Sequence, residues 1–181
     1  FNIWMRLLKK IENSTLWLKI SNKEARLNIL KEANLRNVSS KKIIFAENVS
    51  LEDHMSRYKL ADLFLDTYPY GAHTTCADAL WSGLPVLTKK GNSFSSNVSS
   101  SLLNALDMKE LISSNNEEYE KIAIEISSNP EKLKILREKL ANNHKIKNLF
   151  KTSVFTKNLE KAFELVHEKN LKNLSVEGIE I

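Results

Sequence analysis

Residues 63–88, LFLDTYPYGAHTTCADALWSGLPVLT, predict a strand, a helix and a second strand in succession. The apolar run 63–65 ends at an aspartate and has the length of a buried strand. Residues 76–81 predict a helix that stops at Ser82-Gly83, because glycine directly after the last turn is the usual stop signal. A β-prone run, 85–88, follows. The polar loop 66–75 therefore leads from the end of a strand into a helix.

The same alternation continues on both sides of this unit. In order, the pattern predicts helix 2–12, strand 15–20, helix 23–34, strand 42–46, a short helix over 51–58 capped by Ser50, the unit at 63–88, a helix opening within 92–101 and a strand at 111–112. Strands that alternate with helices form right-handed crossovers and a parallel sheet with helices on both faces. The expected fold class is α/β, a doubly wound, Rossmann-like parallel sheet.

From about residue 117 the pattern is purely helical. The predicted helices are 117–127, 131–143, which opens after Pro130, and 153–168; a polar tail over 171–181 follows. One domain is expected over residues 1–170, because a chain of 181 residues can bury one continuous core. We expect the apolar face of 153–168 to pack on polypeptide outside this chain, or to self-associate. Trp4, Trp17 and Trp81 are expected in the core.

Composition excludes several classes of protein. Hydrophobic residues make up 42% and charged residues 27%, which are ordinary globular values. The net charge of +5 is spread among 22 acidic residues without a basic stripe, so nucleic acid is not an expected partner. No apolar run reaches the roughly 20 residues that cross a bilayer. One unpaired cysteine, Cys76, indicates a reducing compartment, the cytoplasm. A start at Phe1, without a leader pattern, suggests a fragment.

The loop before helix 76–81 carries groups suited to a phosphate. The first turn of a helix has free N–H groups and a partial positive charge, which together favour an anion. His73, Thr74 and Thr75 stand at this turn, and Asp78, one turn on, has oxygens for ribose hydroxyls. The alternative is structural, since threonine before a helix is usually a cap and aspartate in the first turn complements the dipole.

His54 and Arg57 are a second candidate pair. They lie three residues apart on the short helix after strand 42–46 and so share a face, where the imidazole can pack on a base and the guanidinium can hydrogen-bond it. The alternative is two solvated polar residues. Motifs for a P-loop, a dinucleotide fold, a zinc protease, a CxxC zinc site or a serine nucleophile elbow are absent. Asp62 and Asp66 lie four apart rather than as a DxD pair, so no metal is expected.

Three stretches together resemble a known family. They are 60–67, LADLFLDT, 71–88, GAHTTCADALWSGLPVLT, and 91–98, GNSFSSNV. In this order they are similar to the C-terminal catalytic lobe of O-GlcNAc transferase and its SPINDLY-like and bacterial tetratricopeptide-linked relatives, over about residues 2–165. The resemblance implies a GT-B architecture of two Rossmann-like lobes, of which this chain is the second lobe without its first strand. It implies transfer of a sugar from a UDP-sugar, most often UDP-GlcNAc, to protein Ser or Thr with inversion and without a metal or other cofactor.

The resemblance also implies roles for single residues. His54 matches the histidine that contacts uracil, Arg57 the arginine nearby, and Asp78 the aspartate that binds ribose; His73, Thr74 and Thr75 match the diphosphate-binding motif. Two positions depart from the animal enzymes, with Leu51 in place of a lysine and Asn97 in place of an arginine.

The family's diphosphate-neutralising lysine lies upstream of Phe1, so no catalytic residue is expected within the chain and the isolated lobe is expected to be inactive. The expected partners are the N-terminal lobe, tetratricopeptide repeats, the UDP-sugar and an acceptor protein. A transferase with another sugar or acceptor, and a degenerate nucleotide-sensing or interaction module, remain alternatives.

Overall fold

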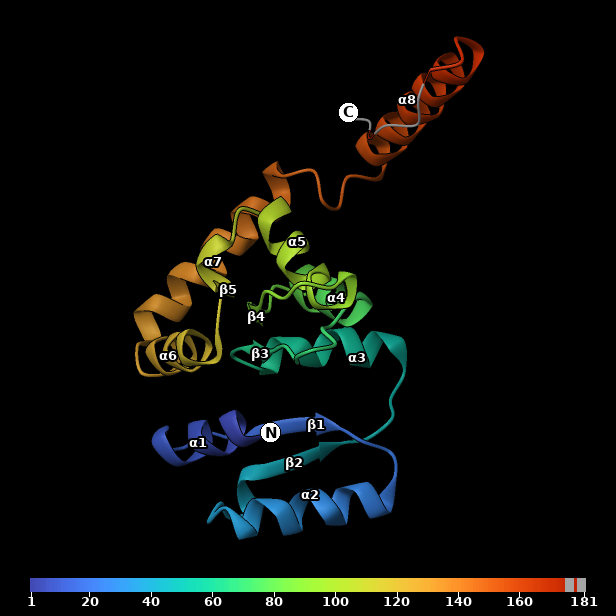
Figure 1. Cartoon of the computed structure of the whole chain (residues 1–181). Helices are drawn as coiled ribbons and strands as arrows, with labels where there is room; N and C mark the ends of the chain where they lie inside the picture. The colour runs from blue at the N-terminus through green and yellow to red at the C-terminus, as the bar shows by residue number, and fades with distance from the viewer. Residues whose placement is uncertain (175–177, 179–181) are drawn as a thin grey trace.

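The computed structural model of the chain describes residues 1–174 and 178; the rest of the expected tail, 175–177 and 179–181, lies outside the described residues. Five short strands alternate with helices (Figure 1). The strands are β1 (Leu16–Lys19), β2 (Ile43–Ala46), β3 (Phe64–Leu65), β4 (Val86–Lys89) and β5 (Ile112–Ser113). All three strand pairings are parallel, with Leu16 opposite Ile43, Phe64 opposite Val86 and Thr88 opposite Ile112. The predicted parallel α/β fold is confirmed.

The strands form two groups and not one continuous sheet. β1 pairs with β2, and β4 pairs with β3 on one side and β5 on the other; within residues 1–174 and 178, the other edges of β1 and β3 have no strand partner. Figure 1 shows the β1–β2 pair below the β3 group. In the doubly wound order 3-2-1-4-5-6, the first strand lies between the second and the fourth. The break falls where that order places the strand that the resemblance implies is missing.

The helices begin and end near their predicted positions. They are α1 (Asn2–Lys10), α2 (Lys23–Leu35), α3 (Leu51–Arg57), α4 (Thr74–Trp81), α5 (Val98–Ala105), α6 (Asn116–Ser127), α7 (Pro130–Ile146) and α8 (Thr152–Leu171). Local signals explain this agreement. Ser50 Oγ accepts the Asp53 N–H at 3.1 Å, Pro130 occupies the first turn of α7, and Gly83 after α4 adopts φ +82°.

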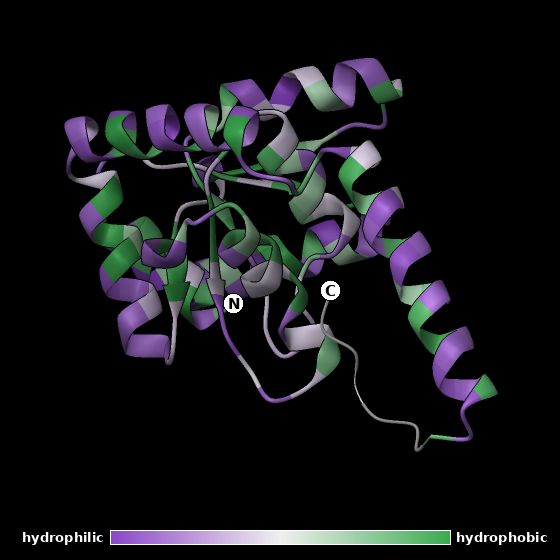
Figure 2. Ribbon diagram, turned by 90° about the horizontal axis from the view of Figure 1, so that it is seen from above, coloured by the Kyte–Doolittle hydropathy of each residue, from purple (hydrophilic) through white to green (hydrophobic). Residues whose placement is uncertain are grey.

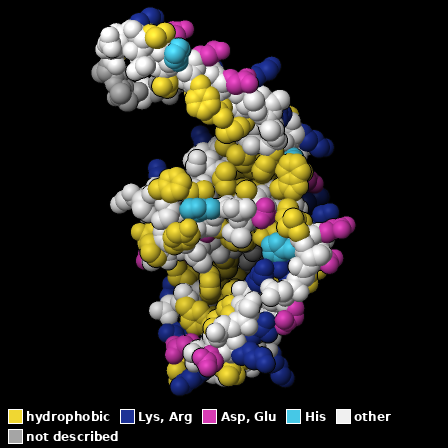
Figure 3. Space-filling model, turned by 90° about the vertical axis from the view of Figure 1, so that its right-hand side faces the viewer, with side chains coloured by type: hydrophobic (Ala, Val, Ile, Leu, Met, Phe, Trp, Pro, Cys, Tyr) yellow, Lys and Arg dark blue, Asp and Glu magenta, His cyan; other side chains and the backbone are white. Residues whose placement is uncertain are grey.

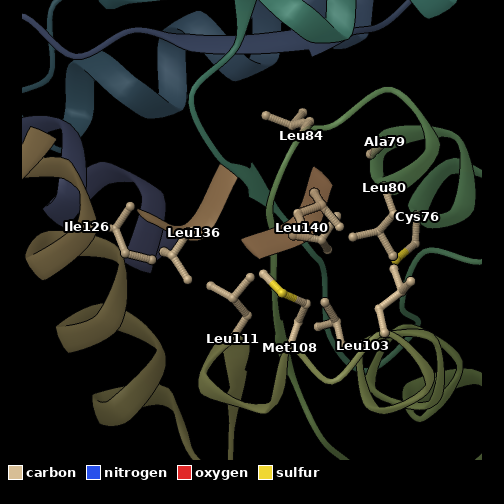
Figure 4. Close-up of a cluster of buried hydrophobic side chains, with 12 residues drawn as sticks. Cys76, Ala79, Leu80, Leu84, Leu103, Met108, Leu111, Ile126, Leu136 and Leu140 are labelled. Carbon is tan, nitrogen blue, oxygen red and sulfur yellow. The ribbon is translucent and has the colours of Figure 1, made fainter. Parts of the chain in front are cut away.

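Both faces of β4 are covered by helices, as a doubly wound sheet requires. Because successive strand residues point to opposite faces, Val86 packs with Leu80 and Leu103 from α4 and α5, whereas Leu87 packs with Leu7 and Tyr119 from α1 and α6. The first of these clusters is the main core (Figure 4), and α7 closes it with Leu136 and Leu140. A smaller core joins α1 and α2 to β1 and β2. α4 therefore packs directly on the main core.

The last helix, α8, is 20 residues long and has no buried residue. It extends away from the rest of the chain (Figure 1), with polar and apolar residues alternating along it (Figure 2). Phe155, Phe163 and Val166 are each more than half exposed. At its base, an open pocket of about 330 Å³ is lined by Trp81, Leu149, Phe150, Thr152 and Phe155.

Trp17 and Trp81 are 39% and 55% exposed, so the prediction that both belong to the core was wrong.

Candidate functional site

The three residues predicted to bind a diphosphate stand together at the start of α4. His73 is the residue before the first turn, and Thr74 and Thr75 are the first two helical residues, both exposed. In the described part of the chain, no side chain caps this helix. The alternative in which a threonine caps α4 was therefore wrong, and the first turn offers its N–H groups and hydroxyls to an anion.

Two aromatic side chains hold the imidazole of His73. Tyr70 stacks on it, with ring centroids 5.2 Å apart and planes 15° apart, and Phe94 meets it edge-on at 5.8 Å. The Nε2 atom of His73 lies 3.4 Å from the Ser95 carbonyl oxygen. Tyr70 and Phe94 are themselves 67% and 83% exposed. On one face of the molecule, Figure 3 shows histidine side chains bordered by apolar ones. The sequence analysis did not single out Tyr70 or Phe94. The signal that could have found them is an aromatic residue within each of two polar loops, one of which also carries His73.

His54 and Arg57 contact each other on α3. Arg57 Nε donates to His54 Nδ1 at 3.0 Å, and Arg57 Nη1 donates to the Glu47 carbonyl at 2.9 Å. A ring nitrogen that accepts a hydrogen bond carries no proton, so neutral His54 carries its proton on Nε2. That atom lies 3.3 Å from the hydroxyl of Tyr58, a residue that sequence reasoning missed despite its place four residues on. The guanidinium thus orients His54 and does not project freely.

The charge of Asp78 acts on residues of this region. Partial burial lowers the pKa of His54 below its ordinary value, as do the charges of Arg57 and Lys19, whereas the carboxylate of Asp78 acts in the opposite direction. Burial also raises the pKa of Tyr58, and Asp78 adds to this effect. The carboxylate of Asp78 on α4 therefore influences the protonation of both His54 and Tyr58.

The two positions at which the sequence departs from the animal enzymes lie at the starts of helices. Leu51, the first residue of α3, is 74% exposed. Asn97 precedes α5 and donates from Nδ2 to the Ser93 carbonyl at 2.9 Å, while its buried Oδ1 has no partner among the described residues.

Other chemistry has little support in this region. In the part of the chain that the structure describes, no three His, Cys, Asp or Glu side chains gather as metal ligands. Burial raises the pKa of the Cys76 thiol to about 12, which leaves it protonated and unreactive. Over the same described residues, no helix is long and apolar enough to cross a membrane.

Comparisons with known proteins agree with this geometry. Two relatives described as UDP-N-acetylglucosamine–peptide N-acetylglucosaminyltransferases are similar to the chain: one from Arabidopsis thaliana (SEC, named as probable), 32% identical over 90% of this chain, and one from Caenorhabditis elegans, 30% identical over 88%. The chain spans only 17% and 14% of their lengths. A solved mutant of Thermobaculum terrenum O-GlcNAc transferase superimposes with a TM-score of 0.84 at 28% identity, covering 90% of this chain and 32% of that one. Residues 1–159 match the description "Glycosyl transferase family 41". The chain belongs to glycosyl transferase family 41.

Proposed function

We propose that residues 1–170 are the donor-binding lobe of an inverting GT-B glycosyltransferase, which transfers GlcNAc from UDP-GlcNAc to Ser or Thr of proteins. The observation that carries the proposal is the uncapped start of α4 in the described chain, where His73, Thr74 and Thr75 stand together. We take this turn to be the anion site. The names of the relatives support the choice of donor and acceptor. Their greater length supports a second lobe, tetratricopeptide repeats and an acceptor groove supplied by further polypeptide.

In this proposal α4 binds the diphosphate and the ribose of UDP, and α3 binds the uracil. The diphosphate lies at the first turn of α4, Asp78 holds the ribose, and His54, oriented by Arg57, packs on the uracil. As the sugar leaves, negative charge develops on the diphosphate, and fixed N–H dipoles stabilise that charge without rearranging. No metal is required in this scheme. In this scheme further polypeptide positions the acceptor, so we expect the chain alone to bind the donor without transfer. We also propose a cytoplasmic location for the protein.

Calorimetric titration of the chain with UDP and with UDP-GlcNAc tests the proposal. The chain should bind both, and the double variant His73→Ala/Thr74→Ala should lose binding, because it removes the imidazole and one hydroxyl at the anion site. The matched control is His167→Ala/Thr156→Ala on α8, which changes the same residue types at exposed positions and should bind normally. Unchanged binding by the first variant, or no binding by the folded parent chain, contradicts the proposal and favours a degenerate module. Tighter binding of another UDP-sugar than of UDP-GlcNAc would change only the donor.

A further inference from the structure

We propose that Asp66 is a positioning residue that shapes the diphosphate-binding loop without touching the ligand. This inference rests on the proposed function. Asp66 follows β3, is 5% exposed, and stands seven residues before His73. Its carboxylate closes residues 67–72 into a fixed loop, and that loop aims His73 and the first turn of α4 at the ligand.

One carboxylate oxygen joins the two ends of the loop. Asp66 Oδ1 accepts the Thr67 N–H at 2.8 Å and the Ala72 N–H at 2.7 Å. The other oxygen, Oδ2, accepts the hydroxyl of buried Thr88 on β4 at 2.7 Å. A hydroxyl and two amide donors converge on one buried carboxylate, and hydrogen bonds to a charged acceptor are about twice as strong as neutral ones. The loop is thus tied to the sheet at the point from which α4 starts.

Two further hydrogen bonds fix the far end of the loop, at Gly71 and Ala72. The Gly71 N–H donates to the Ser95 carbonyl at 2.9 Å, and Ser99 Oγ donates to the Ala72 carbonyl at 2.7 Å. A Cβ at Gly71 would stand 3.1 Å from both Asp66 Oδ2 and the Ser95 carbonyl oxygen, so the loop passes as close to the carboxylate as a glycine allows. His73 comes next, and the same Ser95 carbonyl faces its ring.

The carboxylate cannot serve as a ligand contact itself. It is buried, its oxygens already accept three hydrogen bonds, and its charge would repel a diphosphate. Its effect on binding must therefore pass through the backbone of the loop. Loss of the carboxylate should move the amides and the imidazole out of place, and hydrogen bonds to the ligand weaken steeply as their geometry departs from the ideal.

Three variants of the chain separate this role from plain stability. Asp66→Ala removes the anchor of both amides and should weaken UDP binding by about tenfold or more, the effect of losing a hydrogen bond to a charged ligand. Asp66→Asn keeps one oxygen for the two amides, while Thr88 can turn its hydroxyl to accept from the new amide nitrogen, so binding should stay within about threefold. Thr88→Val is the matched control: it removes one buried hydrogen bond but leaves both amides anchored, and it should lower the melting temperature without lowering UDP affinity.

Two measurements decide the outcome for variants whose circular dichroism shows a folded chain. UDP affinity comes from calorimetry, and amide NMR signals of Ala72, His73 and Thr74 report loop shape without any ligand. The inference is overturned if Asp66→Ala leaves these signals and UDP affinity unchanged, or if Thr88→Val weakens binding as much as Asp66→Ala does. If the folded parent chain does not bind UDP, the proposed function fails and this inference falls with it; a parent chain that binds, beside an Asp66→Ala chain that binds equally, refutes only the positioning role.

Discussion

The candidate site has two walls that are built differently. The phosphate wall, residues 66–81, is rooted in the main core: α4 buries Cys76, Ala79 and Leu80 completely, and the loop before it is tied to β4 through Asp66. The base wall, residues 47–58, carries α3, which has no buried residue. The Ser50 cap and the contact of Arg57 with the Glu47 carbonyl act within this segment, which reaches the main core through partly buried Tyr58.

The difference between the two walls indicates which contacts with the ligand need a fixed geometry. Elements with many buried apolar contacts open only with much of the fold, whereas exposed elements open locally at lower cost. Charge that develops on a diphosphate is stabilised best by donors that are already in place. A base that stacks and accepts a few hydrogen bonds tolerates a movable wall. Perturbations of the phosphate wall should therefore affect the whole chain, and perturbations of the base wall should stay local.

The largest expected difference between the two walls is in the stability lost when one leucine in each is truncated. Leu80→Ala, in the phosphate wall, removes a fully buried side chain and should lower the free energy of unfolding by about 2–5 kcal/mol. Leu51→Ala, in the base wall, changes a side chain that is 74% exposed and should alter it by no more than about 0.5 kcal/mol. Urea denaturation followed by circular dichroism measures both. Similar losses from the two substitutions would show that the walls are anchored alike.

Removing the N-cap of α3 should have a smaller effect, and it tests whether the base wall opens independently of the phosphate wall. Ser50→Ala removes the acceptor of the Asp53 N–H and should make α3 open more easily by about 1 kcal/mol, with weaker UDP binding through displaced His54. Amide hydrogen exchange should rise in α3 and remain unchanged in α4. Asn115→Ala, which removes a similar cap from α6, is the control: it should lower stability without changing UDP affinity. Faster exchange in α4 after Ser50→Ala would mean that the two walls open together.

The sequence was most informative where structure depends on neighbouring residues. Ser50, Pro130 and Gly83 act within one helical turn, so their positions predicted the helix ends well. The same locality explains why His73, Thr74 and Thr75 were found together at one helix start. Parallel pairing also followed, because alternating strands and helices leave few other topologies.

What the sequence could not predict depends on residues far apart along the chain. Asp66 meets Thr88 across 22 positions and the Tyr119 hydroxyl across 53, and neither spacing has a local signature. Phe94 reaches His73 from another loop. Trp81 has the apolar character of a core residue, yet it lies at the surface with His144 and Phe150, beside the base of α8.

The smallest expected effect is a dependence of stability on pH that arises from the base wall. The pKa of His54 in the folded chain is lowered by partial burial and then by the charge of Arg57, whereas in the unfolded chain it has its ordinary value of about 6.5. As pH falls below that value, the unfolded state takes up a proton before the folded state does. The contribution of neutral His54 is therefore fully present above about pH 6.5 and is lost as pH falls through the lower, folded pKa.

His54→Gln should remove this dependence, because glutamine keeps a polar side chain of similar reach and does not titrate. We expect the melting temperature of the parent chain to fall relative to that of the variant between about pH 6.5 and 5, by no more than about 2 °C, because the ring is largely solvated. Differential scanning calorimetry at several pH values measures the difference. Parallel curves for the two proteins would show that His54 titrates alike in both states. A larger gap would mean that α3 excludes water more than an exposed helix should, and the base wall would then be as firmly held as the phosphate wall.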